Sequence, residues 1–192
     1  MSESTPSHPI FAKHPEAAQM IEDLRSESDR GVLLITAAYA EQLLAELLGA
    51  ALSGDGVDEL LETSNAPLSG IRNKIMIARA LGVLPRYIAD GVDQLRKARN
   101  HCAHHVHEVT FADQRIRAHI NNIVIPDGHD IDTGDRYFYI GRIVGLMAVL
   151  QGWTAFAIAL LSKSTMRADM RAHAELRREK WGLQSDPRFR FE

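Results

Sequence analysis

Arg99, Asn100 and His104 bring a guanidinium, an amide and an imidazole together within residues 99–104. Cleavage of RNA without a metal needs a group that takes the 2′-hydroxyl proton or protonates the leaving 5′-oxygen. It also needs a cation that stabilises the charge growing on the phosphate. Histidine suits the first task because its pKa lies near neutrality, and arginine suits the second through its planar fork. In this candidate catalytic set His104 is the general acid and base, Arg99 clamps the phosphate, and Asn100 orients one of them.

A helix must position these side chains. At about 100° per residue, one wedge of roughly 80° collects four apolar side chains and one cation. They are Ile88, Val92, Leu95, Arg99 and Cys102. Arg99 is therefore expected on the buried face, where a permanent charge is costly unless it is paired. Asn100 and His104 are four residues apart and share a neighbouring face.

A structural ion pair is the alternative to a catalytic site. Glu41 projects onto the edge of an earlier apolar stripe and is a candidate partner for Arg99, although a glutamate at such an edge can equally reach water. Asp29 is a second possible partner. In this interpretation Asn100 and His104 only cap a helix end, where cationic groups suit the macrodipole.

Four histidines close to the motif suggest a metal site as a further alternative. They are His101, His104, His105 and His107. His101 and His105 are four apart and could present two imidazoles on one face. The sequence offers no second ligand cluster, so neither a metal nor another cofactor is expected, and bound zinc or nickel would be adventitious. His105 is kept as a supporting residue of the catalytic set.

The composition favours a single cytoplasmic domain. The chain has 192 residues, a net charge of −3 and one cysteine. This charge gives no broad basic surface, so any contact with nucleic acid must be local. Cys102 excludes an intramolecular disulfide and suits a reducing cytosol. The first residues lack the basic and apolar regions of a secretory signal.

Apolar periodicity and capping residues predict an all-α, single-domain helical bundle with a long apolar helix near its C-terminus. Predicted helices cover residues 15–26, 29–51, 57–61, 69–81, 85–104, 110–120, 135–161 and 163–180. The helix predicted at 69–81 is expected to bury Leu81. Thr110 with Asp113 is expected to form a capping box at the start of the helix predicted at 110–120. Residues 1–13 are predicted to be loosely ordered, residues 14–182 to form the domain, and residues 183–192 to be an extended tail.

Residues 143–162 contain no charge and are long enough to cross a membrane. Gln151 and Thr154 interrupt the stretch, and cations flank it on both sides, so the positive-inside asymmetry is missing. A buried central helix is therefore favoured over a membrane span.

The order of several short motifs resembles the mannitol operon repressor (MltR-like) family of small helical proteins, over about residues 20–120. The motifs are Glu27-Ser28-Asp29-Arg30-Gly31, Pro67-Leu68-Ser69, Ile75-x-x-Ala78-x-Ala80-Leu81-Gly82, Leu95-Arg96-Lys97-x-Arg99-Asn100-x-x-Ala103-His104 and Phe111-x-Asp113. The spacing from Arg99 to His104 also resembles the Arg-x4-6-His signature of HEPN domains. This second resemblance implies a helical homodimer that brings two copies of the pair into one cleft. Many HEPN domains are metal-independent ribonucleases of toxin–antitoxin and defence systems.

Together these features favour a HEPN-like RNA-binding protein with a metal-independent endoribonuclease activity, in a stress, toxin–antitoxin or defence system. The alternative is a non-catalytic MltR-like regulator that acts through protein–protein contacts. Expected partners are a second copy of the chain, RNA, and a protein such as an antitoxin or regulator. No segment resembles the recognition helix of a helix-turn-helix, so direct DNA binding is not expected.

Overall fold

The computed structural model describes residues 15–52, 56–61, 66–104, 109–125 and 135–163. Within these residues the chain forms seven helices and no strand, which confirms the all-α prediction. The helices are α2 (Pro15–Arg25), α3 (Asp29–Ala51), α4 (Val57–Leu61), α5 (Ile71–Ala80), α6 (Arg86–His104), α7 (Gln114–Asn121) and α8 (Arg136–Lys163).

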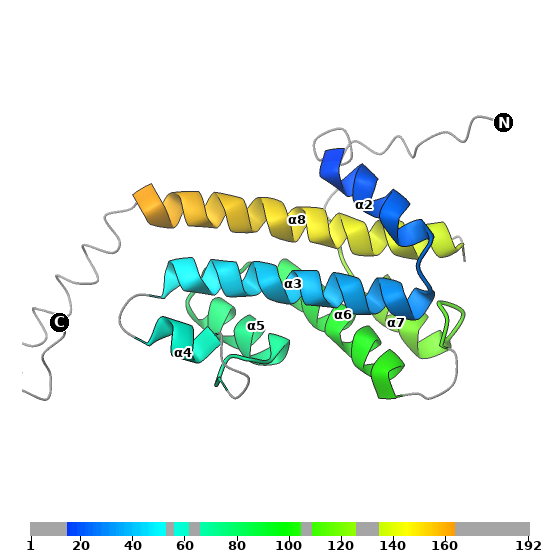
Figure 1. Ribbon diagram of the computed structural model, residues 1–192, viewed down its shortest axis with the longest axis horizontal. Helices are drawn as coiled ribbons and strands as arrows, with labels where there is room; N and C mark the ends of the chain where they lie inside the picture. The colour runs from blue at the N-terminus through cyan, green and yellow to red at the C-terminus, as the bar shows by residue number, and fades with distance from the viewer. Residues whose placement is uncertain (1–14, 53–55, 62–65, 105–108, 126–134, 164–192) are drawn as a thin grey trace, which may run out of the picture.

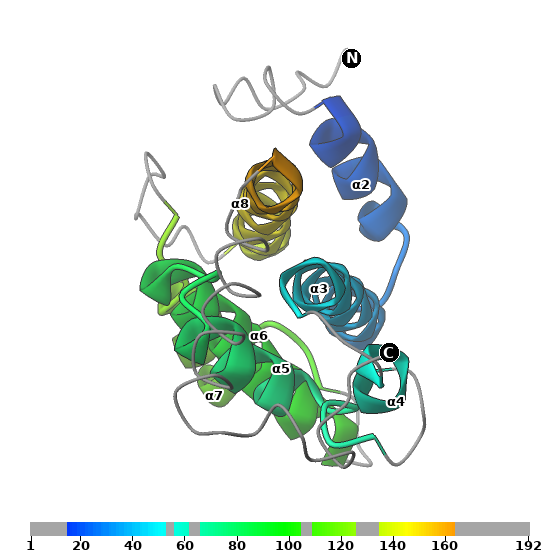
Figure 2. The ribbon, with the colours of Figure 1, turned by 90° about the vertical axis from the view of Figure 1, so that its left-hand side faces the viewer.

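Helices α3 and α8 lie side by side and run in the same direction (Figure 1). Helix α2 lies on one side of this pair, whereas α5, α6 and α7 lie on the other (Figure 2). The core fills the space between α3, α6 and α8. An apolar stripe of α3 faces this core, and Leu33, Ala40, Leu44 and Leu47 are fully buried in it, whereas Ala51 at the end of the stripe is only partly buried.

Local chemistry sets several helix ends. The Ser28 hydroxyl accepts a hydrogen bond from the Gly31 amide and caps the start of α3. Gly82 has a φ of 72° and turns the chain after α5, as predicted. Leu81 was expected to be buried but is 43% exposed, because it is already the C-cap of α5 and the chain turns away there.

The capping box predicted at Thr110 is wrong. Asp113 itself is the N-cap of α7, and its carboxylate accepts from the amides of Arg115 and Ile116. The Thr110 hydroxyl instead accepts from the Ala112 amide in the preceding turn. The short, charged Asp113 side chain reaches both free amides of the first turn, so the helix begins three residues later than a Thr110 cap would place it.

Helices α3 and α8 are both long and apolar enough, by length and composition, to cross a membrane. Half of each apolar window is buried inside the protein, and the core helices of soluble proteins have the same character.

Several predictions fall outside the described residues. They concern residues 1–13, His105, His107, the helix predicted at 163–180 and the tail at 183–192. The predicted division of the chain into these segments stays a prediction.

Candidate functional site

Arg99 is exposed, so its predicted place on the buried face is wrong. The apolar members of the same wedge are all fully buried: Ile88, Val92, Leu95 and Cys102. The Arg99 side chain is long enough to carry its charge from this face to water.

Glu41 does not pair with Arg99. Its Oε1 accepts from Nζ of Lys74 at 2.8 Å, and the same Nζ donates to the Ser69 carbonyl at 3.1 Å. The Lys74 side chain is 5% exposed and that of Glu41 is 34% exposed. A buried ammonium requires a nearby acceptor, so Lys74 takes the carboxylate that the sequence offered to Arg99.

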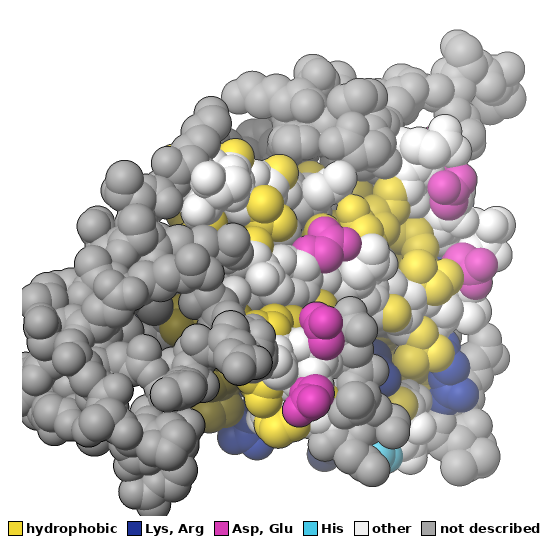
Figure 3. All heavy atoms as spheres, turned by 60° about the vertical axis from the view of Figure 1, so that its left-hand side comes forward, with side chains coloured by type: hydrophobic (Ala, Val, Ile, Leu, Met, Phe, Trp, Pro, Cys, Tyr) yellow, Lys and Arg dark blue, Asp and Glu magenta, His cyan; other side chains and the backbone are white. Residues whose placement is uncertain are grey.

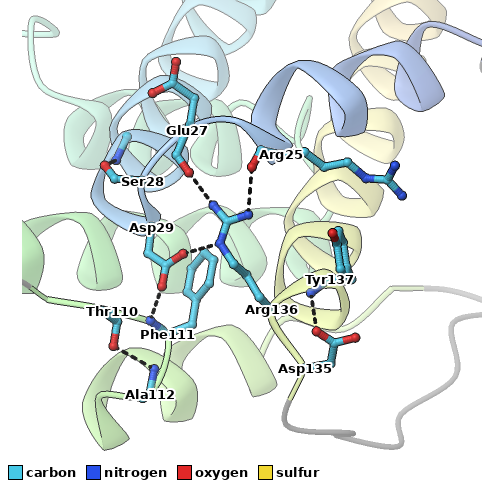
Figure 4. A network of polar contacts seen from close by, with 11 residues as sticks. Arg25, Glu27, Ser28, Asp29, Thr110, Phe111, Ala112, Asp135, Arg136 and Tyr137 are labelled. Atoms are coloured by element: carbon cyan, nitrogen blue, oxygen red, sulfur yellow. Dashed lines mark hydrogen bonds and ion pairs between the residues drawn. The ribbon is translucent and has the colours of Figure 1, made fainter.

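Asp29 does not pair with Arg99 either. One of its oxygens accepts from Nε of Arg136 at 2.6 Å, and the other accepts from the Phe111 amide at 2.8 Å. The same Arg136 guanidinium also donates to the carbonyl oxygens of Arg25 and Glu27 (Figure 4). Both oxygens of Asp29 are therefore used in a clamp that joins α3 to the start of α8.

Two of the three predicted catalytic residues are in contact. Nη1 of Arg99 donates to Oδ1 of Asn100 at 3.0 Å. His104 is the last residue of α6 and is exposed, and its side chain makes no hydrogen bond within the described part of the chain. Arg99 and His104 are five residues apart and hence about 140° apart around the helix. A single chain therefore does not direct both at one atom.

The end of α6 is held by Arg30, which donates from Nη2 to the Cys102 carbonyl at 3.0 Å. This contact supplies a cation to a helix C-terminus, as the macrodipole favours. Cys102 is fully buried and behaves as a small core residue.

Two histidines join α6 to α7: His101, which the sequence suggested only as a metal ligand, and His119, which it did not single out. Nε2 of His101 lies 3.4 Å from Oδ2 of Asp113. Nδ1 of His119 lies 2.9 Å from Oε1 of Gln94. Burial opposes ionisation of Asp113, but hydrogen bonds from two backbone amides and from His101 leave the pKa of its carboxyl below the ordinary value. These contacts span 12 and 25 residues, so the local spacing of residues in the sequence does not predict them.

The described residues between Asp93 and Ile125 carry five Lys and Arg against two Asp. Asp93 already pairs with Arg96 and Lys97, at 2.8 and 2.9 Å. Among the described residues, Arg99 and Arg115 contact no carboxylate. We use the name α6–α7 surface for the cations and imidazoles that α6 and α7 present here: Arg96, Lys97, Arg99, His104, Arg115 and His119. In contrast, acidic and apolar side chains mix across the middle of the face in Figure 3, and Lys and Arg lie toward its lower edge.

Among the described residues, no group of three His, Cys, Asp or Glu side chains could hold a metal ion. The predicted pair of His101 and His105 cannot be placed, because His105 lies outside those residues. A cavity of about 250 Å³ lies between α2, α3 and α8, lined in part by Tyr39, Met147 and Gln151. It is separate from the α6–α7 surface.

The arrangement can therefore bind an anion at the exposed guanidinium of Arg99. The chain matches no protein-family profile and no curated protein. In the X-ray structure of the MtlR–HPr complex from Escherichia coli, one chain is similar to this chain at 18% identity and a TM-score of 0.48. The match covers 78% of this chain and 99% of that chain.

Proposed function

We propose that this protein binds RNA through the α6–α7 surface and that Arg99, steadied by Asn100, contacts the phosphodiester backbone. The observation that carries the proposal is the exposure of Arg99 with no carboxylate partner among the described residues. A guanidinium in this state keeps its donors available for the paired oxygens of a phosphate. A partner-bound arginine would first have to break its ion pair.

The surrounding charge supports a local contact with a polyanion. The whole chain carries a net charge of −3, so long-range attraction to nucleic acid is absent. Binding would then depend on the few cations of the α6–α7 surface and on the counterions that their phosphate contacts release. Such binding is expected to be weakened strongly by salt.

The test is fluorescence anisotropy of a labelled single-stranded oligouridylate titrated with the full chain. We expect Arg99→Ala to weaken binding about tenfold, because a charge-assisted hydrogen bond contributes roughly 1.5 kcal/mol. Arg86→Ala is the matched control, since its side chain is 84% exposed at the other end of α6. Equal affinities for wild type, Arg99→Ala and Arg86→Ala would refute the assignment of Arg99.

Cleavage is the second part of the proposal and requires two copies of the chain. One copy offers one exposed histidine of the predicted catalytic set, His104, whereas RNA cleavage uses a proton acceptor and a proton donor. A homodimer that brings two α6 ends together would supply both. The labelled RNA, incubated with the protein in excess EDTA, should yield 2′,3′-cyclic phosphate ends, and His104→Ala should abolish them. Intact RNA would remove cleavage from the proposal and leave binding in place.

The second candidate function is a non-catalytic regulator that works through protein contacts, including contacts between two copies. Phe156 and Leu160, near the end of α8, are 53% and 52% exposed, and this apolar surface favours the candidate. Sedimentation velocity should then show a dimer that the double variant Phe156→Ser, Leu160→Ser converts to a monomer. Met76→Ser, on an exposed side chain of α5, is the matched control. A wild-type monomer that binds RNA would reject this candidate.

As part of the RNA-binding proposal, we expect the protein to be located in the cytoplasm. Cell fractionation should recover the protein with the soluble fraction. Recovery with membranes that resists high salt would instead support a span by α3 or α8.

A further inference from the structure

His119 and Gln94 form a fixed pair across α7 and α6. Nδ1 of the imidazole lies 2.9 Å from Oε1 of the carboxamide. A carboxamide oxygen can only accept, so Nδ1 must carry the proton and donate it. In the neutral ring this leaves Nε2 with a lone pair that can accept a hydrogen bond.

The surroundings keep the ring neutral. Burial lowers the pKa of His119, and the nearby charge of Lys97 and the His101 imidazole lower it further. From the same helix Asp93 raises this pKa and Arg96 lowers it. On the α8 side, Arg142 donates to two carbonyl oxygens at the end of α7 and just after it, those of Asn121 and Ile123.

Most of the α6–α7 surface consists of donors. Arg96, Lys97, Arg99 and Arg115 can only donate hydrogen bonds, and a phosphate is the group that they suit. Phosphates are the same in RNA and DNA, so these contacts carry affinity without selecting the sugar. A fixed acceptor close to the cations of Lys97 and Arg96 suits a hydroxyl that lies next to a phosphate. In nucleic acids that hydroxyl is the ribose 2′-OH, which DNA lacks.

We propose that Nε2 of His119 accepts a hydrogen bond from a ribose 2′-hydroxyl, so that the α6–α7 surface selects RNA over DNA. Gln94 is the positioning residue, because its oxygen fixes the tautomer and the orientation of the ring. This inference rests on the RNA binding proposed above and adds the selection of the sugar.

The experiment compares the affinities of the full chain for an oligouridylate and for the oligodeoxyuridylate of the same length. We expect the wild type to prefer RNA about fivefold, the net effect of one hydrogen bond. His119→Leu removes the acceptor and should lower RNA affinity to the level of DNA. His119→Gln can restore an acceptor oxygen and should retain a preference for RNA.

The pH dependence separates this role from a purely structural one. Acidification protonates Nε2 and turns the acceptor into a donor, so the preference of the wild type should disappear as the pH falls through the pKa of His119. Gln94→Glu places a carboxylate against Nδ1 and raises that pKa, so the preference should disappear at a higher pH than in the wild type. The preference of His119→Gln should not respond to pH in this range.

The outcomes distinguish this inference from the proposed function. Equal binding of RNA and DNA by the wild type would overturn the 2′-hydroxyl contact and leave binding through the phosphates intact. A preference that survives in a folded His119→Leu, checked by circular dichroism, would also overturn it. If that variant does not fold, the pH dependence of the RNA preference in the wild type and in Gln94→Glu still tests the contact between His119 and the 2′-hydroxyl. Failure to bind either oligonucleotide would overturn the proposed function itself.

Discussion

Asp29 and Arg136 are the first residues of α3 and α8, and their side chains form an ion pair of 2.6 Å. The two positions are 107 residues apart in the sequence. The same pair also holds the Phe111 amide and two carbonyl oxygens of the α2–α3 connection. It therefore fixes the common end from which the two central helices start (Figure 4).

Loss of the Asp29 carboxylate should destabilise the protein strongly. Its side chain is 13% exposed, and Asp29→Ala leaves Arg136 and the Phe111 amide without their acceptor. We expect a loss of about 2–4 kcal/mol in the free energy of unfolding, measured by urea denaturation. Asp90→Ala, which removes two exposed ion pairs, should cost less than about 0.5 kcal/mol. Similar losses in the two variants would contradict the clamp.

The pair of Glu41 and Lys74 should respond asymmetrically to substitution. Glu41→Ala strands a buried ammonium, and we expect a cost of about 2–4 kcal/mol. Lys74→Met fills the same space with an apolar chain and leaves a carboxylate that is already 34% exposed to water, so the cost should be below about 1.5 kcal/mol. Chemical denaturation of both single variants and the double variant gives the interaction free energy between the two side chains. A larger loss in Lys74→Met would reverse the assignment.

Two helical glycines should give opposite results when replaced by alanine. A Cβ at Gly91 would lie 2.8 Å from Cδ1 of Leu146, which is itself buried. A Cβ at Gly141 would meet nothing within 4 Å. Gly141→Ala should therefore raise the stability by about 0.5–1 kcal/mol, whereas Gly91→Ala should lower it by about 1–3 kcal/mol. The melting temperatures should shift in opposite directions, and a rise in both would show that Leu146 yields easily.

Acidification should destabilise the folded chain through His119. Burial, with the charge of Lys97, holds the pKa of His119 below the ordinary 6.5. Below about pH 6.5 the unfolded chain therefore binds a proton that the folded chain resists. The contribution to stability is complete above that pH and is lost progressively as the pH falls through the folded pKa. The melting temperature of His119→Gln should fall less than that of the wild type between about pH 7.5 and 5.5. Equal falls would contradict a lowered pKa.

Local sequence signals predicted much of the helical framework. Ile116 and Ile120 lie four residues apart, a spacing that places both on one face of a helix, and both are fully buried. The predicted helices at 29–51 and 69–81 end close to Ser28 and Gly82 because capping chemistry acts within a few residues. The predicted burial of Leu81 is wrong because the helical pattern of apolar residues continues through this position, whereas the backbone already turns there.

Side-chain partners could not be predicted in the same way. A helical projection gives the angle of Arg99 on its own helix but not which neighbouring elements cover that angle. The projection also placed Glu41 correctly at the edge of the apolar stripe of α3. Glu41 pairs with Lys74 and not with Arg99 because of the way α5 packs on α3, which a projection of one helix does not give. The pairing of His119 with Gln94 joins two helices across 25 residues, so only the tertiary fold reveals it.

The most direct test of RNA binding at Arg99 is the salt dependence of oligouridylate affinity for the wild type and Arg99→Ala. Each phosphate contact on a single strand contributes about 0.7 to the slope of log K against log salt concentration. We expect the Arg99→Ala slope to be shallower by roughly this amount, with Arg86→Ala unchanged and the stability of all three within about 0.5 kcal/mol. Identical slopes for wild type and Arg99→Ala would contradict a phosphate contact at Arg99.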